Sequence, residues 1–262
     1  AVQHENQQQN ESRKKHPPGL YLLFATEAWE RFSYYGMRAI LVLYLTATAA
    51  QGGLGVDKAT ALSLYGTFTS AVYITPMIGG YLTDRFLGRR LAITIGGVIM
   101  ALGNFSIFIH QSVAALYIGL ALLIIGNGFF KPNISTLVGD LYAENDPRRD
   151  GAFTIFYMGI NFGAFFAPLV VGLMSYKYGF LTAAIGMVVG QILFNLLANR
   201  YLGDIGKEPT GKVHAAASQT STAPLTAREK KRTVAIVILA FVVIAFWTAF
   251  EQAGSSLTLY AQ

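Results

Sequence analysis

The chain has 262 residues, of which 53% are hydrophobic and only 13% are charged, and it contains no cysteine. This composition is too apolar for a water-soluble protein of this length, and the lack of cysteine excludes a disulfide framework and a thiolate metal site. The formal net charge is +6, but the basic residues lie in loops between hydrophobic runs, which argues against a nucleic-acid partner. The sequence therefore predicts an all-α integral membrane protein with no metal site.

Residues 1–18 are polar, rich in Gln and Asn, and end in the pair Pro17-Pro18. We interpret them as a disordered cytoplasmic tail, because they hold too few apolar residues to bury a core. The proline pair is expected to start the first helix, since proline is favoured at the first helical position.

The first predicted membrane helix, from about Leu20 to Thr48, carries a polar face inside an otherwise apolar segment. A charge at the centre of a membrane helix costs about 2.5–3.5 kcal/mol, so this face is expected to line a bundle interior or an aqueous cavity. An internal salt-bridge set that only fixes helix packing is the alternative interpretation. At about 100° per residue, the residues that share the face are Glu27, Glu30, Arg31, Tyr34, Tyr35 and Arg38.

The segment from Glu27 to Gly36 resembles the ExxERFxYYG motif on the first helix of proton-coupled oligopeptide transporters. These transporters are a branch of the major facilitator superfamily. The resemblance implies an N-terminal six-helix bundle over residues 19–202, made of two inverted three-helix repeats and followed by the first helix of a C-terminal bundle.

The second predicted helix, from Asp57 to about Asp84, has Tyr65, Thr69 and Tyr73 at helical spacing. Packing alone would also explain Tyr73. The loop that follows, residues 80–90, is similar to the facilitator motif GxLxDRxxGRR. In that family the loop gates the inner side, so the resemblance assigns gating rather than substrate contact to three residues, whose alternative role is loop solubility: Asp84, Arg85 and Arg89.

The third helix is expected over 91–109 and the fourth over 113–142, where Lys131 lies inside the segment GNGFFKPN. A lone lysine could snorkel to an interface. The glycines and Pro132 instead favour a segment that lines a cavity. The segment resembles the GxGxxKPNIS sequence of the transporters' fourth helix, which implies that Lys131 interacts with Glu27 or Glu30.

The fifth helix is expected over 152–176 and the sixth over 180–201. Residues 153–164 resemble a second signature of the same family, in which the asparagine, here Asn161, reaches the peptide. Asn161 could otherwise form a hydrogen bond between helices. Basic residues fall on alternate loops, which places the tail and the even-numbered loops in the cytoplasm by the positive-inside rule.

Residues 203–231 are polar and are interpreted as a flexible cytoplasmic linker, followed by a seventh helix over 233–260 within the segment 232–262. Glu251 is the only acid in this helix and lies one turn from Trp247. Resemblance to the family's seventh helix implies that Glu251 is a protonation site that interacts with Arg38 across the two halves. Trp247 is then expected to bind the substrate. A helix cap near the end of the span is the alternative for Glu251.

The resemblance implies proton-driven import of di- and tripeptides by alternating access, in a monomeric, multi-pass protein of the cytoplasmic (cell inner) membrane. The proton is then the coupling ion, with no other cofactor, and carboxylates carry it because all four histidines lie in the tail or in loops. The expected proton-coupling residues are Glu27, Glu30, Arg31, Lys131 and Glu251. The expected substrate-binding residues are Arg31, Tyr34, Tyr35, Arg38, Tyr73, Lys131, Asn161, Trp247 and Glu251.

Two other functions stay open: a facilitator for another cargo, such as nitrate or a drug, and a peptide sensor that does not transport. A glycosidase that uses Glu27 and Glu30 as its acids is disfavoured, because two carboxylates three residues apart on a membrane helix suit a cavity better than a sugar ring. The protein is therefore not expected to be an enzyme. A complete facilitator has twelve spans, so the resemblance extends over about half of a family member.

Overall fold

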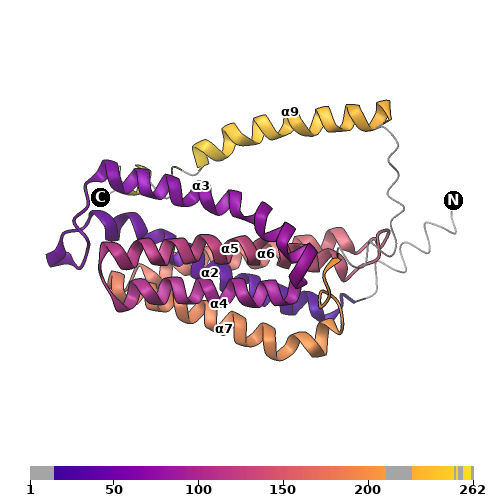
Figure 1. The fold of residues 1–262 in the computed structure, drawn as a ribbon, viewed down its shortest axis with the longest axis horizontal. Helices are drawn as coiled ribbons and strands as arrows, with labels where there is room; N and C mark the ends of the chain where they lie inside the picture. The colour runs from indigo at the N-terminus through magenta and orange to yellow at the C-terminus, as the bar shows by residue number, and fades with distance from the viewer. Residues whose placement is uncertain (1–14, 211–225, 251, 253–255, 261–262) are drawn as a thin grey trace.

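The computed structural model describes residues 15–210, 226–250, 252 and 256–260, and all regular structure in these residues is helical (Figure 1). Most of the helices lie alongside one another as a bundle of long, roughly aligned rods. In chain order the elements are α2 (Pro18–Thr46), η1 (Ala49–Gln51), α3 (Lys58–Leu82), η2 (Thr83–Leu87), α4 (Arg89–Ile109), α5 (Val113–Asp140), α6 (Arg149–Val171), α7 (Tyr176–Leu202), α9 (Ala227–Phe250) and α10 (Ser256–Tyr260).

Local signals in the sequence explain where several helices begin. Pro18 is the first residue of α2, as the proline pair predicts. Asp57 caps α3, because its carboxylate accepts a hydrogen bond of 3.0 Å from the backbone N–H of Thr60. Ser112 caps α5 in the same way, through a 3.2 Å bond from the N–H of Ala115.

The packing of the bundle follows a twofold pattern. Helix α2 packs against α6 and α7, α5 packs against α3 and α4, and α4 packs against α7. Exchanging α2 with α5, α3 with α6 and α4 with α7 turns this set of contacts into itself. That relation is the one expected of two three-helix repeats and confirms the predicted architecture.

Glycines allow two matching pairs of helices to approach closely. A Cβ atom on Gly79 of α3 would lie 2.0 Å from the carbonyl oxygen of Gly128 in α5. In the matching pair, a Cβ atom on Gly163 of α6 would lie 2.3 Å from the carbonyl oxygen of Ala28 in α2. Small residues bring membrane helices into backbone contact, and here a larger side chain would force each pair apart.

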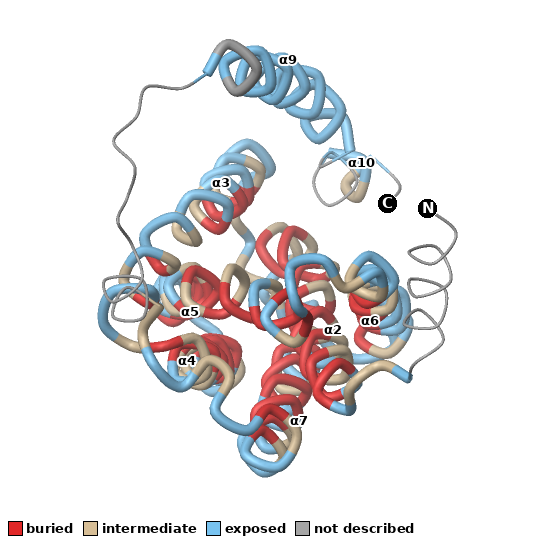
Figure 2. The backbone as a smooth tube through the Cα atoms, turned by 90° about the vertical axis from the view of Figure 1, so that its right-hand side faces the viewer, coloured by how far each residue is buried: buried red, intermediate tan, exposed pale blue. Residues whose placement is uncertain are grey.

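The bundle helices and α9 differ in how far their residues are buried. Buried residues concentrate where the bundle helices face one another, whereas α9 is exposed and set beyond α3 (Figure 2). Among the described residues, five helices are long and apolar enough to cross a membrane: α4, α5, α6, α7 and residues 230–250 of α9. Helices α2 and α3 are longer than 20 residues, but charged and polar side chains lower their hydropathy.

Several predicted boundaries are wrong. The fifth helix ends at Val171, next to Gly172, rather than near 176, and the second gives way at Thr83 to η2, a π-helical turn. Helix α9 begins at Ala227, inside the predicted linker. Of the single helix expected over 233–260, α9 extends to Phe250 and α10 covers Ser256–Tyr260, and residues 251 and 253–255 lie outside the described part. Residues 1–14 and 211–225, which include most of the predicted tail and linker, lie outside the described residues.

Candidate functional site

The predicted polar face of α2 contains a buried ion cluster. Arg31 binds Glu30 through both Nε and Nη2, with the Nη2 to Oε1 distance being 2.7 Å. Its Nε also lies 3.2 Å from Oε1 of Glu27, which is one helical turn away. The side chains of Arg31, Glu27 and Glu30 are 5%, 4% and 0% exposed. Three charged groups are therefore held together out of contact with solvent.

One carboxylate of this cluster is held less fully than the other. Glu30 accepts two hydrogen bonds from Arg31, whereas Glu27 has one close contact, and its Oε2 is buried without a hydrogen-bond partner among the described residues. A buried carboxylate oxygen without a partner carries a desolvation cost that protonation relieves. The described contacts therefore satisfy Glu30 more fully than Glu27, and a role for either carboxylate in proton exchange stays a prediction.

Aromatic rings cover the arginines of α2. The guanidinium carbon of Arg31 lies 5.2 Å from the centre of the Tyr34 ring and 5.9 Å from that of Tyr35. The guanidinium of Arg38 lies 5.8 Å from the Tyr35 ring. These cation–π contacts place Tyr35 against both predicted arginines and Tyr34 against Arg31.

Sequence analysis missed Tyr65 as a site residue. Its hydroxyl accepts a 2.5 Å hydrogen bond from Nε of Arg38, and this bond joins α3 to α2. A signal was present, because Tyr65, Thr69 and Tyr73 recur at four-residue spacing and share one face of α3. Only the fold shows that this face meets Arg38.

Lys131 of α5 lies close to both α3 and α2. Its Nζ is 4.8 Å from the centre of the Tyr73 ring. Its positive charge is also near enough to attract the Glu27 carboxylate. The geometry thus brings Lys131 to the charged face of α2, on the side of Glu27, which was one of the two partners expected from sequence. A functional role for this proximity stays a prediction.

A cavity of about 440 Å³ lies between α3 and α9, and two of the predicted substrate residues, Tyr73 and Trp247, line it. The Thr69 hydroxyl, which is buried and has no hydrogen-bond partner among the described residues, also contributes to its wall. Aromatic rings, hydroxyls and an amide together suit a ligand that has both polar and apolar parts. The lining residues are Leu62, Tyr65, Gly66, Thr69, Ser70, Tyr73, Ile244, Trp247, Thr248, Gln252 and Ser256.

One predicted site residue, Asn161, is not joined to this cluster. Asn161 lies on an exposed face of α6, and its amide donates a 3.0 Å hydrogen bond to the carbonyl of Tyr157 in its own helix. Glu251 lies outside the described residues. Within the described part of the chain, no group of three or more His, Cys, Asp or Glu residues is placed to hold a metal ion.

The three predicted gating residues lie where α3 passes through η2 into α4. Arg89 forms an ion pair with Asp140 at the end of α5 and lies 3.7 Å from Asp84. Arg85 donates a 2.8 Å hydrogen bond to the Tyr81 hydroxyl. Sequence analysis missed Asp140, whose only signal was its place at the end of a span on the same side of the bundle. The contact ties the loop to α5.

The segment that follows α7 packs onto this loop. The backbone N–H of Arg90 donates a 2.9 Å hydrogen bond to the carbonyl of Gly206. Gly88 has φ of +77°, and a Cβ atom there would lie 2.3 Å from the carbonyl oxygen of Lys207. Glycine is therefore required at this position both by the backbone conformation and by the close approach of the second segment.

Comparisons with known proteins agree on one family. Residues 90–222 match the model of the POT family. The chain is 49% identical over 195 residues to the uncharacterized transporter YclF of Bacillus subtilis, covering 73% of this chain and 40% of that protein. It is 43% identical over 216 residues to a di-/tripeptide transporter of Lactococcus lactis, covering 80% of this chain and 44% of that protein.

Solved structures agree as well. The crystal structure of the peptide transporter POT (E310Q mutant) in complex with alafosfalin superposes with a TM-score of 0.73 at 42% identity. The alignment covers 92% of this chain and 50% of that one. The chain thus spans about half the length, or less, of the proteins it matches.

Proposed function

The chain belongs to the POT family, and on that premise we propose that the protein imports di- and tripeptides together with protons by alternating access. The matched relatives are transporters, and the Lactococcus lactis relative is named for di- and tripeptides. Because the chain covers less than half of these relatives, the activity of the whole protein is our proposal.

The proposed substrate-binding surface has a cationic part and a polar part. A peptide is a zwitterion with a shared backbone and variable side chains, so a promiscuous site needs fixed charges for its ends and hydrogen-bond groups for its backbone. Arg31, Arg38 and Lys131 would attract the peptide carboxylate. The hydrogen-bond groups would come from Tyr34, Tyr35, Tyr73 and Asn161, with Trp247 at the wall of the cavity.

The observation that carries proton coupling is the buried cluster of Arg31 with Glu27 and Glu30. When a glutamate of this cluster binds a proton, its attraction for Arg31 is lost and the guanidinium becomes available for the peptide carboxylate. Proton and peptide then favour each other's binding, as linkage requires. Lys131 would respond to Glu27 in the same way, since the two charges attract each other.

Glu251, in the seventh span, is proposed as a second protonation site that interacts with Arg38. This role rests on the family resemblance alone. The proton would be the coupling ion, and no other cofactor is proposed.

We further propose that the protein is monomeric and lies in the cytoplasmic membrane with its N-terminus in the cytoplasm. The length and hydropathy of the five apolar helices support a membrane location. The basic residues on alternate loops support the orientation.

The test is uptake of a labelled dipeptide by proteoliposomes that contain the full-length protein, with and without an inward proton gradient. Gradient-driven uptake that Glu251→Gln loses, while counterflow exchange continues, supports peptide symport with Glu251 as a coupling site. Loss of exchange as well would assign Glu251 to binding rather than coupling.

The same experiment separates the other functions. Dipeptide binding without uptake under either condition would identify a sensor. If the protein neither binds nor takes up the dipeptide but transports nitrate or a drug, it is a facilitator-fold transporter of another cargo. No contact in the described residues favours these alternatives over peptide transport.

A further inference from the structure

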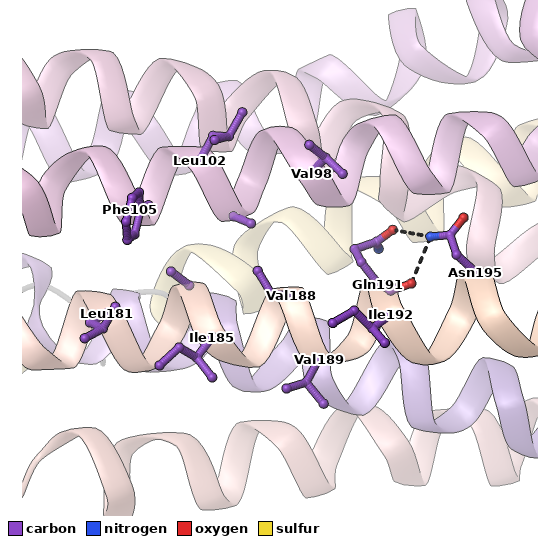
Figure 3. A pocket seen from close by; sticks show the side chains of 12 residues that line it. Val98, Leu102, Phe105, Leu181, Ile185, Val188, Val189, Gln191, Ile192 and Asn195 are labelled. Atoms are coloured by element: carbon purple, nitrogen blue, oxygen red, sulfur yellow. Dashed lines mark hydrogen bonds between the residues drawn. The ribbon is translucent and has the colours of Figure 1, made fainter.

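A groove of about 570 Å³ runs between α4 and α7 (Figure 3). Both helices are apolar and long enough to cross a membrane. Aliphatic and aromatic side chains project into the groove over most of its length, and two amides lie at one end. The lining residues are Val98, Ala101, Leu102, Phe105, Leu181, Ala184, Ile185, Val188, Val189, Gln191, Ile192 and Asn195.

The apolar part of the groove is open and has the dimensions of a lipid chain. Leu102 is 54% exposed and Ile185 is 53% exposed. Along α7 the lining extends from Leu181 to Asn195, which is about 21 Å at roughly 1.5 Å per residue. One leaflet of a hydrocarbon core is about 15 Å thick, so the groove is long enough for a whole acyl chain. Because α4 and α7 are long and apolar enough to span a membrane, the open side of the groove would face the hydrocarbon core of the bilayer.

Beyond the polar end of the groove, separate hydrogen bonds join α4 to α7, and the last of them come from an arginine. Thr94 donates a 2.9 Å hydrogen bond to Oδ1 of Asn195. One turn further, Nη2 of Arg90 donates a 2.7 Å hydrogen bond to Oδ1 of Asn199. Nη1 of Arg90 donates a 2.8 Å hydrogen bond to the carbonyl of Gly203, at the end of α7. Arg90 therefore lies near the start of α4, about two helical turns before Val98, and contacts α7 one turn beyond Asn195.

No carboxylate among the described residues lies at ion-pair distance from Arg90. Its two side-chain acceptors, an amide and a backbone carbonyl, are uncharged. Asp204 attracts Arg90 from farther away, but its carboxylate is paired with Lys207 at 2.8 Å. A half-buried cation at the end of an apolar, membrane-facing groove favours an anionic group attached to a hydrocarbon chain.

We propose that this groove binds an anionic phospholipid, with one acyl chain between α4 and α7 and the phosphate at Arg90. The amides of Gln191 and Asn195 then mark the boundary between the chain and the head-group region. The proposal depends on the membrane location of α4 and α7 and is independent of the peptide-transport proposal, since neither Arg90 nor the groove touches the α2 cluster.

The test is native mass spectrometry of the full-length protein released from nanodiscs made of equal parts phosphatidylglycerol and phosphatidylcholine. The wild type is expected to retain phosphatidylglycerol about fivefold over phosphatidylcholine, the preference that one basic residue gives for an anionic lipid. Arg90→Gln, which keeps a hydrogen-bond donor, should bring this ratio to about one. Val188→Trp fills the groove at a 44% exposed position and should reduce the retention of both lipids.

Two control variants match these changes elsewhere. Ile118→Trp adds the same bulk at a 57% exposed position of α5 that does not line the groove. Arg148→Gln removes a basic charge at the start of α6. Both should retain lipid as the wild type does, and size-exclusion profiles check that every variant is folded.

The outcomes separate the parts of the proposal. Unchanged lipid retention in Val188→Trp would overturn the groove as the lipid site. Loss of both lipids in Val188→Trp with an unchanged ratio in Arg90→Gln would keep the chain site and overturn the head-group assignment. A dimer without bound lipid that Val188→Trp converts to a monomer would show that a second copy of the chain occupies the groove.

Discussion

Two clusters in this chain use the same chemistry, one arginine between two carboxylates, in opposite surroundings. On α2, Arg31 and its partners Glu27 and Glu30 are at most 5% exposed. All three residues belong to one helix, so the helical repeat alone brings them within reach. The bundle then buries them, which makes each charge depend on the other two.

The second cluster lies at the surface where α3, α4 and α5 end. Arg89 is 15% exposed there, whereas its partners Asp84 and Asp140 are 55% and 31% exposed. Solvent and salt screen such a pair, so it contributes little to stability and links the loop to α5 only weakly. The two clusters contain the same kinds of charge and differ in burial. Burial, rather than the identity of the charges, therefore decides how much an ion pair contributes to the stability of the fold.

The largest effect is expected from Arg31→Gln, which removes the only cation among the described residues that contacts both buried carboxylates and leaves Lys131 as the nearby charge of Glu27. Removing one partner of a buried ion pair destabilises a protein by about 3–5 kcal/mol. We expect a large fall in the thermal unfolding midpoint in detergent and loss of dipeptide uptake. Arg200→Gln, at an exposed arginine that stacks on Tyr201, is the matched control and should change neither. A midpoint equal to that of the wild type would contradict the structural importance of the buried cluster.

A smaller effect on stability, but a specific one on coupling, is expected from Glu27→Gln. Arg31 keeps its hydrogen bond to Glu30 in this variant, so its buried charge stays paired. Because the amide cannot exchange a proton, the stimulation of uptake by an inward proton gradient should fall at least about fivefold, the lower end of usual coupling energies. Counterflow exchange should continue. Full gradient dependence in the variant would move the proton site away from Glu27.

Tyr65→Phe tests the hydrogen bond that joins α3 to α2. A hydrogen bond to a charged group contributes about 1.5–3 kcal/mol, so the loss of the hydroxyl should leave Arg38 less well positioned. We expect the KM for dipeptide to rise about tenfold with a smaller change in the maximal rate. Tyr117→Phe, at an exposed tyrosine of α5, controls for the loss of a hydroxyl. Equal KM values for both variants would show that Tyr65 does not position Arg38.

The surface cluster should respond much less. Asp140→Asn weakens the contact with Arg89 and is expected to lower stability by no more than about 1 kcal/mol. The loss should shrink further in 1 M salt, where screening is strong. Unfolding midpoints at low and high salt measure this. A salt-independent loss as large as that of Arg31→Gln would contradict the comparison between the two clusters.

The smallest effect concerns Asp146, in the loop before α6. Hydrogen bonds from Arg148 hold its pKa at about 2, below the ordinary value of 3.8. A carboxylate with a lowered pKa stabilises the folded state above pH 4, and this contribution is lost as the pH falls through about 2. Asp146→Asn should therefore be slightly less stable than the wild type at pH 6, with the difference disappearing near pH 2. A difference that persists at pH 2 would point to packing rather than charge.

Much of this molecule could be predicted from local patterns. The first helix and its polar face followed from Pro18 and from the spacing of Glu27, Glu30 and Arg31, because partners within one helix are set by the helical repeat. Helix ends were predicted less well. The end of α6 at Val171, next to Gly172, is an example, because propensity alone does not decide at which residue a helix ends.

The sequence by itself determined that the chain is a membrane-spanning helical protein and that one helix carries an ion cluster, because composition and helical periodicity are local properties. Only the tertiary structure decided that Tyr65 holds Arg38, that Asp140 holds Arg89, and that α4 and α7 leave a groove with Arg90 at its end. Each of these contacts joins different helices, and glycine-mediated approach and the angles at which helices cross fix such contacts.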